Sequence, residues 1–134
     1  MRILAIDYGR KRIGLAISDP LGVMAHGLET LHRKSVRKDV AYLEKLVRQQ
    51  GVGLIVVGNP LLLDGTPSEM SVEAEEFGAR LAEACGVEYR MWDERMTSLE
   101  AGHLLRETGR APGRDGGVDQ MAARIILDSY LAAQ

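Results

Sequence analysis

The chain has 134 residues, of which 46% are hydrophobic and 27% charged, and its formal net charge is −2. This length suits one domain with one core, the composition is typical of a globular protein, and the small net charge excludes a strongly basic nucleic-acid binder. No apolar stretch approaches the roughly 20 residues that span a bilayer, and no signal-peptide pattern opens the chain, so we expect a cytoplasmic protein.

Charge and cysteine usage add two limits. Residues 1–50 carry ten Lys and Arg against five Asp and Glu, whereas residues 51–134 carry seven against fourteen. This asymmetry permits a basic surface on an acidic protein, although solvated helix faces would give the same count. Because Cys85 is the one cysteine, we expect no disulfide within the chain, and we expect its thiol to pack as a small apolar side chain near a helix end.

The first half of the chain predicts three strands and a helix. Apolar runs at 2–8 and 13–18, joined by a short Gly-containing turn, predict a β-hairpin, and residues 26–33 predict a third, edge strand. A helix is predicted over 36–50, because apolar residues recur with helical spacing, Ser35 offers an N-cap and a glycine follows the last turn. Its apolar face consists of Val36, Val40, Leu43 and Val47.

The second half alternates strands with helices. Residues 53–60 are a short apolar run expected of a buried parallel strand, and residues 87–94 predict another strand. Between them the sequence TPSE predicts a helix that is capped by Thr66, with a capping-box partner at Glu69, and runs to about Cys85. A further capped helix, a glycine-rich loop and a last helix complete the chain, at about 97–109, 109–117 and 118–132.

The order of these elements predicts one α/β domain over residues 1–134. A three-strand meander and two parallel strands would make a mixed sheet, with helices covering its faces.

Two acids fall on apolar faces of this fold. Side chains alternate along a strand, so Asp7 shares a face with Ile3 and Ala5, and a buried carboxylate is costly unless it is hydrogen-bonded, paired or bound to a metal. Asp119 belongs to the apolar face of the last helix, although an Asp in a first turn can simply stabilise the helix dipole. The residues that follow it on that face are Ala122, Ala123, Ile126 and Tyr130.

A third acid is expected at the end of the fifth strand. Asp93 and Glu94 lie at its C-terminal edge, where ligands bind in open α/β sheets, and only one of two alternating side chains can point toward Asp7. The alternative is that one of them pairs with a neighbouring arginine such as Arg95. Converging oxygen ligands are what Mg²⁺ or Mn²⁺ requires, and two such ions can activate water and stabilise the leaving oxygen of a phosphodiester.

Four stretches carry a resemblance that covers essentially the whole chain. They are IDYGRKRIGLAISD, LIVVGNPLLLDGT, WDERMTS and VDQMAARIILDSYL, and in this order they resemble the YqgF/RuvX family of ribonuclease H-like proteins. The resemblance implies a five-stranded mixed sheet with flanking helices, a fold similar to that of the RuvC Holliday-junction resolvases. It also implies a nuclease with Mg²⁺ or Mn²⁺ as cofactor. In bacteria its implied function is maturation of the 5′ end of 16S ribosomal RNA, with ribosomal precursor particles as partners, and branched-DNA resolution is attributed to relatives.

Carried over by motif, the catalytic and metal-binding acids are Asp7, Glu94 and Asp119. The chain departs from the related resolvases at the middle acid, because the strand beside the first one ends in Gly-Asn-Pro, without a carboxylate. Asp93 and Asp64 are therefore alternatives for that position.

Cations follow the first acid directly. Arg10, Lys11 and Arg12 are expected to hold phosphates of the strand being cut, unless the turn is simply solvated. Gly9 and Gly14 are expected to serve the backbone of this turn. The other cations assigned to nucleic-acid binding are Arg95, Arg110 and Arg114.

Two other functions fit parts of the pattern. A nucleotide-binding domain of the actin and sugar-kinase type also opens with Asp-x-Gly and a hairpin, but such proteins need two domains and this chain supplies one. A non-catalytic RNA-binding or ribosome-assembly factor could keep the fold without the chemistry. The sequence leaves open whether the substrate is RNA or DNA, whether cutting is endo- or exonucleolytic, and whether the protein is a monomer or a homodimer.

Overall fold

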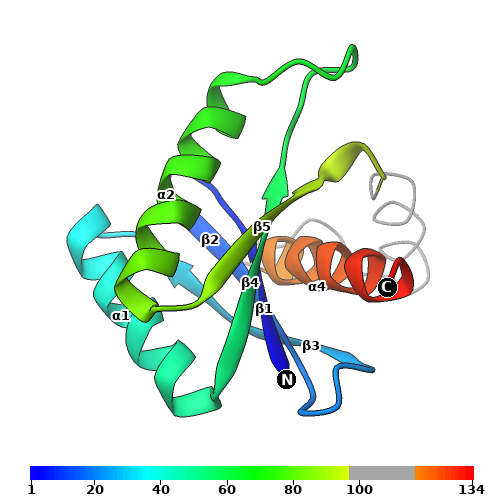
Figure 1. Cartoon of the computed structure of the whole chain (residues 1–134). Coiled ribbons are helices and arrows are strands. Elements are labelled where there is room, and N and C mark those ends of the chain that lie inside the picture. The colour runs from blue at the N-terminus through cyan, green and yellow to red at the C-terminus, as the bar shows by residue number, and fades with distance from the viewer. Residues whose placement is uncertain (97–116) are drawn as a thin grey trace.

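A computed structural model describes residues 1–96 and 117–134 and shows one five-stranded mixed sheet (Figure 1). The strands lie in the order β3-β2-β1-β4-β5; β1 is antiparallel to β2 and parallel to β4. The predicted meander and the two parallel strands are thereby confirmed. The strands are β1 Arg2–Asp7, β2 Arg12–Ser18, β3 Ala25–His32, β4 Val52–Asn59 and β5 Glu88–Asp93.

Helices cover both faces of this sheet. In Figure 1, α1 (Val36–Gln50) and α2 (Glu69–Cys85) lie on one side and α4 (Gly117–Ala132) on the other, and a 3-10 turn, η1 (Glu94–Met96), follows β5. The helix predicted at 97–109 and the loop cations Arg110 and Arg114 lie outside the described residues. No helix of the described residues is long and apolar enough to cross a membrane.

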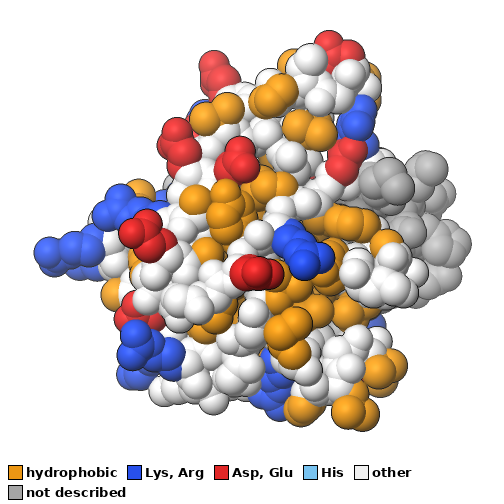
Figure 2. All heavy atoms as spheres, viewed as in Figure 1, with side chains coloured by type: hydrophobic (Ala, Val, Ile, Leu, Met, Phe, Trp, Pro, Cys, Tyr) orange, Lys and Arg blue, Asp and Glu red, His pale blue; other side chains and the backbone are white. Residues whose placement is uncertain are grey.

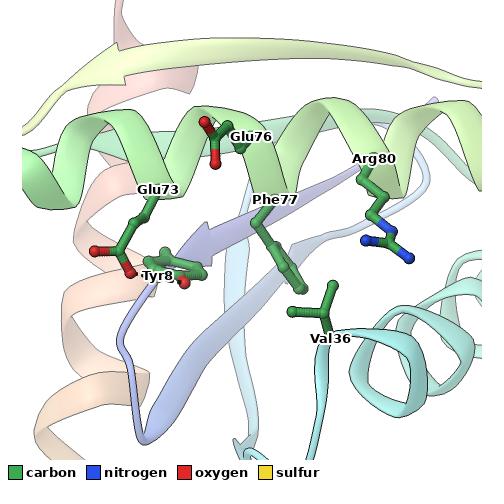
Figure 3. A pocket seen from close by; sticks show the side chains of 6 residues that line it. All are labelled: Tyr8, Val36, Glu73, Glu76, Phe77 and Arg80. Atoms are coloured by element: carbon green, nitrogen blue, oxygen red, sulfur yellow. Dashed lines mark hydrogen bonds between the residues drawn. The ribbon is translucent and has the colours of Figure 1, made fainter.

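Alternation along β1 divides the interior into two cores. Leu4 and Ile6 pack toward α1 and α2, whereas Ile3 and Ala5 pack toward α4. The same alternation continues past the strand, so Asp7 belongs to the α4 side and Tyr8 to the other. Tyr8 meets Phe77 of α2, with the ring centroids 5.5 Å apart (Figure 3). The end of β1 therefore presents a carboxylate to one face and an aromatic ring to the other.

The ends of α1 follow the sequence closely. Ser35 caps the helix by accepting a hydrogen bond from the Lys38 amide, and Gly51 ends it in the left-handed region at φ 67°. Val36, which helical spacing placed on the apolar face, is the first residue of α1 and is 39% exposed. The α2 prediction is partly wrong, because its cap is Ser68, whose hydroxyl also donates to the Pro60 carbonyl; Thr66 bonds to Asp64 instead.

Two smaller expectations also hold. Cys85 ends α2 and packs against the core, as predicted for a small apolar side chain. Figure 2 shows Lys and Arg side chains gathered where α1 begins, and this segment holds the exposed Lys34, Arg37 and Lys38. The positive first half of the sequence thus includes a basic surface in addition to solvated helix positions.

Candidate active site

The last residue of β1 lies in a notch made by two glycines. Asp7 pairs with Gly14 on β2, and Gly58 on β4 follows Val57, the partner of Ile6. A Cβ at Gly14 would collide with the backbone of Asp119. A Cβ at Gly58 would lie 2.6 Å from the Glu94 Oε1 atom. Missing side chains on both neighbouring strands therefore let the other two acids approach Asp7.

This notch corrects the expectation for Gly14. It does not serve the turn, since it lies inside β2, and its lack of a side chain makes room for the start of α4. Gly9 does lie in the turn, where a Cβ would collide with the Arg12 carbonyl oxygen.

Asp7 and Glu94 are joined by a side-chain hydrogen bond. Burial, followed by the charge of Glu94, raises the pKa of Asp7 from 3.8 to about 8. Burial also raises the pKa of Glu94, while the bond from Asp7 acts in the opposite direction. Asp7 is therefore the protonated donor of this bond and Glu94 the acceptor, because the bond favours the neutral form of Asp7 and the charged form of Glu94.

Asp119 completes the group from the first turn of α4. Its negative charge contributes to the raised pKa of Asp7, so the two carboxyl groups act on each other across the notch. The Arg12 guanidinium lies 3.1 Å from Asp119 Oδ2, yet this buried oxygen has no hydrogen-bond partner among the described residues. Of the predicted inward face of the helix, Ala123, Ile126 and Tyr130 are buried, whereas Ala122 is only half-buried.

The chemistry of this donor set fits a divalent cation. A divalent ion prefers oxygen ligands. It would replace the proton shared by the two carboxyl groups and would take the unsatisfied buried oxygen as a ligand. As placed, however, no three His, Cys, Asp or Glu side chains form a group that could hold a metal within residues 1–95 and 117–134. Asp7 and Glu94 are hydrogen-bonded to each other, and Asp119 is paired with Arg12. For all three acids to bind one ion, both contacts have to break.

The alternatives for the middle acid are engaged elsewhere. Asp93 accepts hydrogen bonds from the Arg95 guanidinium and amide, which lower its pKa. Asp64 accepts from the Thr66 hydroxyl and amide, and these bonds lower its pKa as well. Of the three candidates, Glu94 is therefore the one that the structure brings to Asp7.

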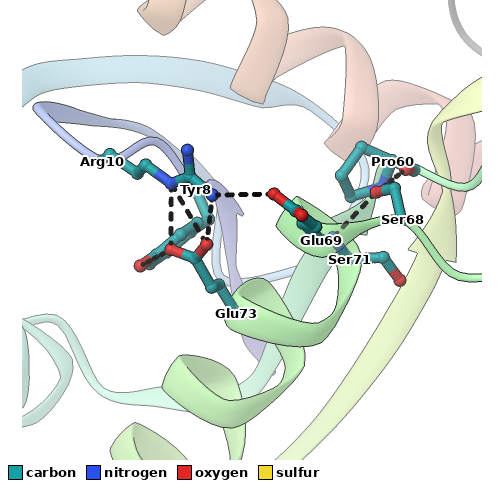
Figure 4. Close-up of polar contacts among 7 residues, drawn as sticks. All are labelled: Tyr8, Arg10, Pro60, Ser68, Glu69, Ser71 and Glu73. Atoms are coloured by element: carbon teal, nitrogen blue, oxygen red, sulfur yellow. Dashed lines mark hydrogen bonds and ion pairs between the residues drawn. The ribbon is translucent and has the colours of Figure 1, made fainter.

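The cations of the first turn have acidic partners. Figure 4 shows Arg10 reaching α2, where its guanidinium donates to Glu73 at 2.6 Å and lies 3.7 Å from Glu69. Arg12 faces Asp119, as described above. Lys11 is exposed, and its carbonyl accepts from the Arg33 amide. Arg95, in η1, donates a hydrogen bond to the Leu63 carbonyl in the loop between β4 and α2.

One buried pair was missed by sequence reasoning. Asp39 is 1% exposed and accepts a 2.9 Å hydrogen bond from Arg33. The Arg33 guanidinium also lies over the Tyr8 ring at 4.9 Å and donates to the Gly9 carbonyl. The available signal was an acid in the first turn of α1 close to a basic segment, which is also the pattern of a solvated helix start.

Comparison with known proteins identifies the family. The model of the RuvX family, described as Holliday junction resolvase, matches residues 1–133. The chain belongs to this family. The expectation of a nuclease, a hydrolase of phosphodiester bonds, is thereby confirmed.

Its relatives are similar over nearly their whole length. A protein of Koribacter versatilis is 47% identical over 131 residues, which are 97% of this chain and 86% of that protein. One of Syntrophus aciditrophicus is also 47% identical, over 99% of this chain and 89% of its own. Both carry the name "Putative pre-16S rRNA nuclease".

Solved structures confirm the fold. Thermus thermophilus RuvC is 16% identical with a TM-score of 0.63, and the match covers 98% of this chain and 97% of that one. The fowlpox virus Holliday junction resolvase is 14% identical with a TM-score of 0.60 over the full length of both chains. The ribonuclease H-like architecture predicted from the motifs is the one observed.

Proposed function

We propose that this RuvX-family protein is a divalent-metal-dependent nuclease in which Asp7, Glu94 and Asp119 are the catalytic acids. The observation that carries this proposal is the Asp7–Glu94 hydrogen bond beside the unsatisfied Oδ2 atom of Asp119. Three neighbouring carboxyl groups, with Arg12 beside only Asp119, are costly to bury, and a bound cation would offset that cost.

The three acids would hold Mg²⁺ or Mn²⁺. Such an ion supplies an activated water and stabilises charge on the leaving oxygen of a phosphodiester. The chain itself supplies the rest: Gly14 and Gly58 leave room for the acids, and Arg12 neutralises Asp119 when the ion is absent. Asp7 must lose its proton before its oxygen can serve as a ligand.

The proposed substrate is the 5′ end of precursor 16S ribosomal RNA. This assignment is supported by the names of the relatives that are 47% identical over almost the whole chain. Branched DNA is the second candidate, supported by the description of the family and by a RuvC structure that contains a Holliday junction. Cytoplasmic location and the choice between monomer and homodimer remain predictions from the sequence.

A substrate panel tests the function. Purified protein with Mg²⁺ or Mn²⁺ is given precursor 16S RNA ends, single-stranded RNA, duplex DNA and four-way DNA junctions, with Asp7→Asn as the matched inactive control. We expect cleavage of the precursor RNA that is abolished by EDTA and by the substitution. Cleavage confined to junctions would support the second candidate, and no cleavage of any substrate would contradict the nuclease proposal.

A further inference from the structure

A pocket lies on the opposite face of the sheet from the acids, at the same end of β1. It has a volume of about 360 Å³. A second hollow of about 270 Å³ (Figure 3) shares Tyr8, Val36 and Glu73 with it. Because Tyr8 directly follows Asp7, the pocket and the acidic notch are on either side of one strand end. The walls of the larger hollow include Tyr8, Arg10, Arg33, Lys34, Ser35 and Glu73.

The two acids that line the larger hollow are hydrogen-bonded to arginines, whereas Glu76 lines the smaller one. Asp39 accepts from the Arg33 guanidinium at 2.9 Å and from the Lys34 amide at 3.1 Å. Glu73 accepts three hydrogen bonds from Arg10 and one from the Tyr8 hydroxyl. Neither carboxylate therefore presents an uncompensated negative charge to an incoming anion.

The floor of the pocket is fixed by aromatic and cationic contacts. The Arg33 guanidinium lies 4.9 Å from the centre of the Tyr8 ring and 5.2 Å from that of Phe77. Its side chain is only 10% exposed, and it donates to the Gly9 carbonyl of the turn that follows Asp7. Such a floor offers a flat, partly apolar surface beside a delocalised cation.

The mouth of the pocket is basic. Lys34 and Ser35 precede α1, and Arg37 and Lys38 follow in its first turn, all of them exposed. Figure 2 shows Lys and Arg gathered at this end of the molecule. A phosphate at the mouth would thus meet Lys34, with Arg37 and Lys38 on the neighbouring surface, and a planar group could lie deeper against Tyr8.

We propose that this pocket holds one nucleotide of the substrate strand, next to the phosphodiester at the acidic notch, with Lys34 at its phosphate. This inference rests on the proposed function, because the strand must pass over the end of β1 to reach both faces. A hollow of about 360 Å³ is of a size for one nucleotide, so the proposal is that the strand is unpaired there. Stacking on an aromatic ring beside a basic groove is the usual mode of single-strand binding.

A binding assay tests the pocket without cleavage. Fluorescein-labelled single-stranded RNA, and DNA of the same sequence, are titrated with the protein in EDTA at several salt concentrations. Lys34→Ala should weaken binding and lower the slope of log affinity against log salt by about 0.7. Val36→Trp, which fills the cavity without changing charge, should weaken binding and leave the slope unchanged. Lys45→Ala is the matched control, since Lys45 is an exposed lysine of α1 outside this pocket.

The outcomes separate this inference from the proposed function. Wild-type binding by both pocket variants, or equal losses in Lys45→Ala, would overturn the pocket whether or not the protein cleaves. Losses confined to the pocket variants would support it even if the substrate panel gave no cleavage. Binding of either strand through the pocket supports the inference, and a preference for RNA would add recognition of the 2′-hydroxyl. A melting curve of each variant, compared with that of wild type, tests whether a loss of binding reflects unfolding.

Discussion

Asp7 retains its proton at neutral pH because burial and the charges of Glu94 and Asp119 raise its pKa to about 8. A carboxyl group in this state is a poor metal ligand, so a divalent ion has to displace the proton. In the metal-free protein, the proton on Asp7 therefore reduces the negative charge of the Asp7–Glu94 pair, and the Arg12 guanidinium compensates the charge of Asp119.

The two acids at the end of β5 should differ sharply when changed to amides. Glu94→Gln removes the partner of Asp7, and we expect cleavage to fall by more than about 100-fold, because even the groups behind metal ligands are worth about 10- to 100-fold. Asp93→Asn only weakens a contact with Arg95 near the surface, and we expect a loss below about tenfold. Initial rates at saturating metal compare them; a dead Asp93→Asn beside an active Glu94→Gln would reverse the assignment.

Arg12 should compete with the metal for Asp119. Since its guanidinium lies 3.1 Å from the Oδ2 atom, Arg12→Gln should raise the affinity for Mn²⁺, measured by calorimetry without nucleic acid. Arg10→Gln is the control, because Arg10 is paired with Glu73 on α2. Equal Mn²⁺ affinities in wild type and Arg12→Gln would show that the arginine does not restrain Asp119.

At the level of elements, the approach of α4 to the sheet depends on Gly14. A Cβ there would collide with the backbone of Asp119, which cannot move without shifting the helix. We expect Gly14→Ala to lower the free energy of unfolding by about 1–3 kcal/mol and to reduce cleavage strongly. Gly53→Ala is a matched strand control, because its Cβ would meet only the flexible Met1 side chain. Urea unfolding and cleavage rates measure both; a Gly14→Ala protein with wild-type activity would contradict this role.

Sequence patterns predicted the ends of an element well where residues close in sequence determine them. Ser35 and Gly51 delimit α1 as expected, because capping and the left-handed conformation are properties of neighbouring residues. The prediction was wrong at α2, where the cap is Ser68, whose hydroxyl accepts from the Ser71 amide and also donates to the Pro60 carbonyl. That contact depends on how the loop folds back, which no local pattern contains.

The site was predictable in part for the same reason. Asp7 and Asp119 followed from strand alternation and helical spacing, each within one element. The choice between Asp93 and Glu94, and the importance of Gly14 and Gly58, depend on how several elements meet. Gly14 looks like a turn residue in sequence, and only its register opposite Asp7 shows that it makes room for another acid.

For the whole molecule, the site makes folding stability depend on pH. The pKa of Asp7 is higher in the folded chain than its ordinary value of 3.8, so the folded state binds its proton more tightly than the unfolded state does. The stabilisation from this proton is complete below about pH 4 and is lost as the pH rises toward about 8. The raised pKa of Glu94 acts in the same direction.

We therefore expect the metal-free protein to lose stability as the pH rises from about 5 to 8, by at most about 1.4 kcal/mol per pH unit for each proton released. Asp7→Asn keeps the size of the side chain and lets its amide donate to Glu94, so its unfolding free energy should vary much less over this range and exceed that of wild type at pH 8. Mg²⁺ or Mn²⁺ should stabilise wild type increasingly as the pH rises, because the ion takes the place of the departing proton, and should have little effect on the variant. Urea unfolding in EDTA and in excess metal at each pH provides the comparison. Parallel pH profiles for wild type and Asp7→Asn in EDTA would show that the titration of Asp7 does not contribute to the stability of the fold.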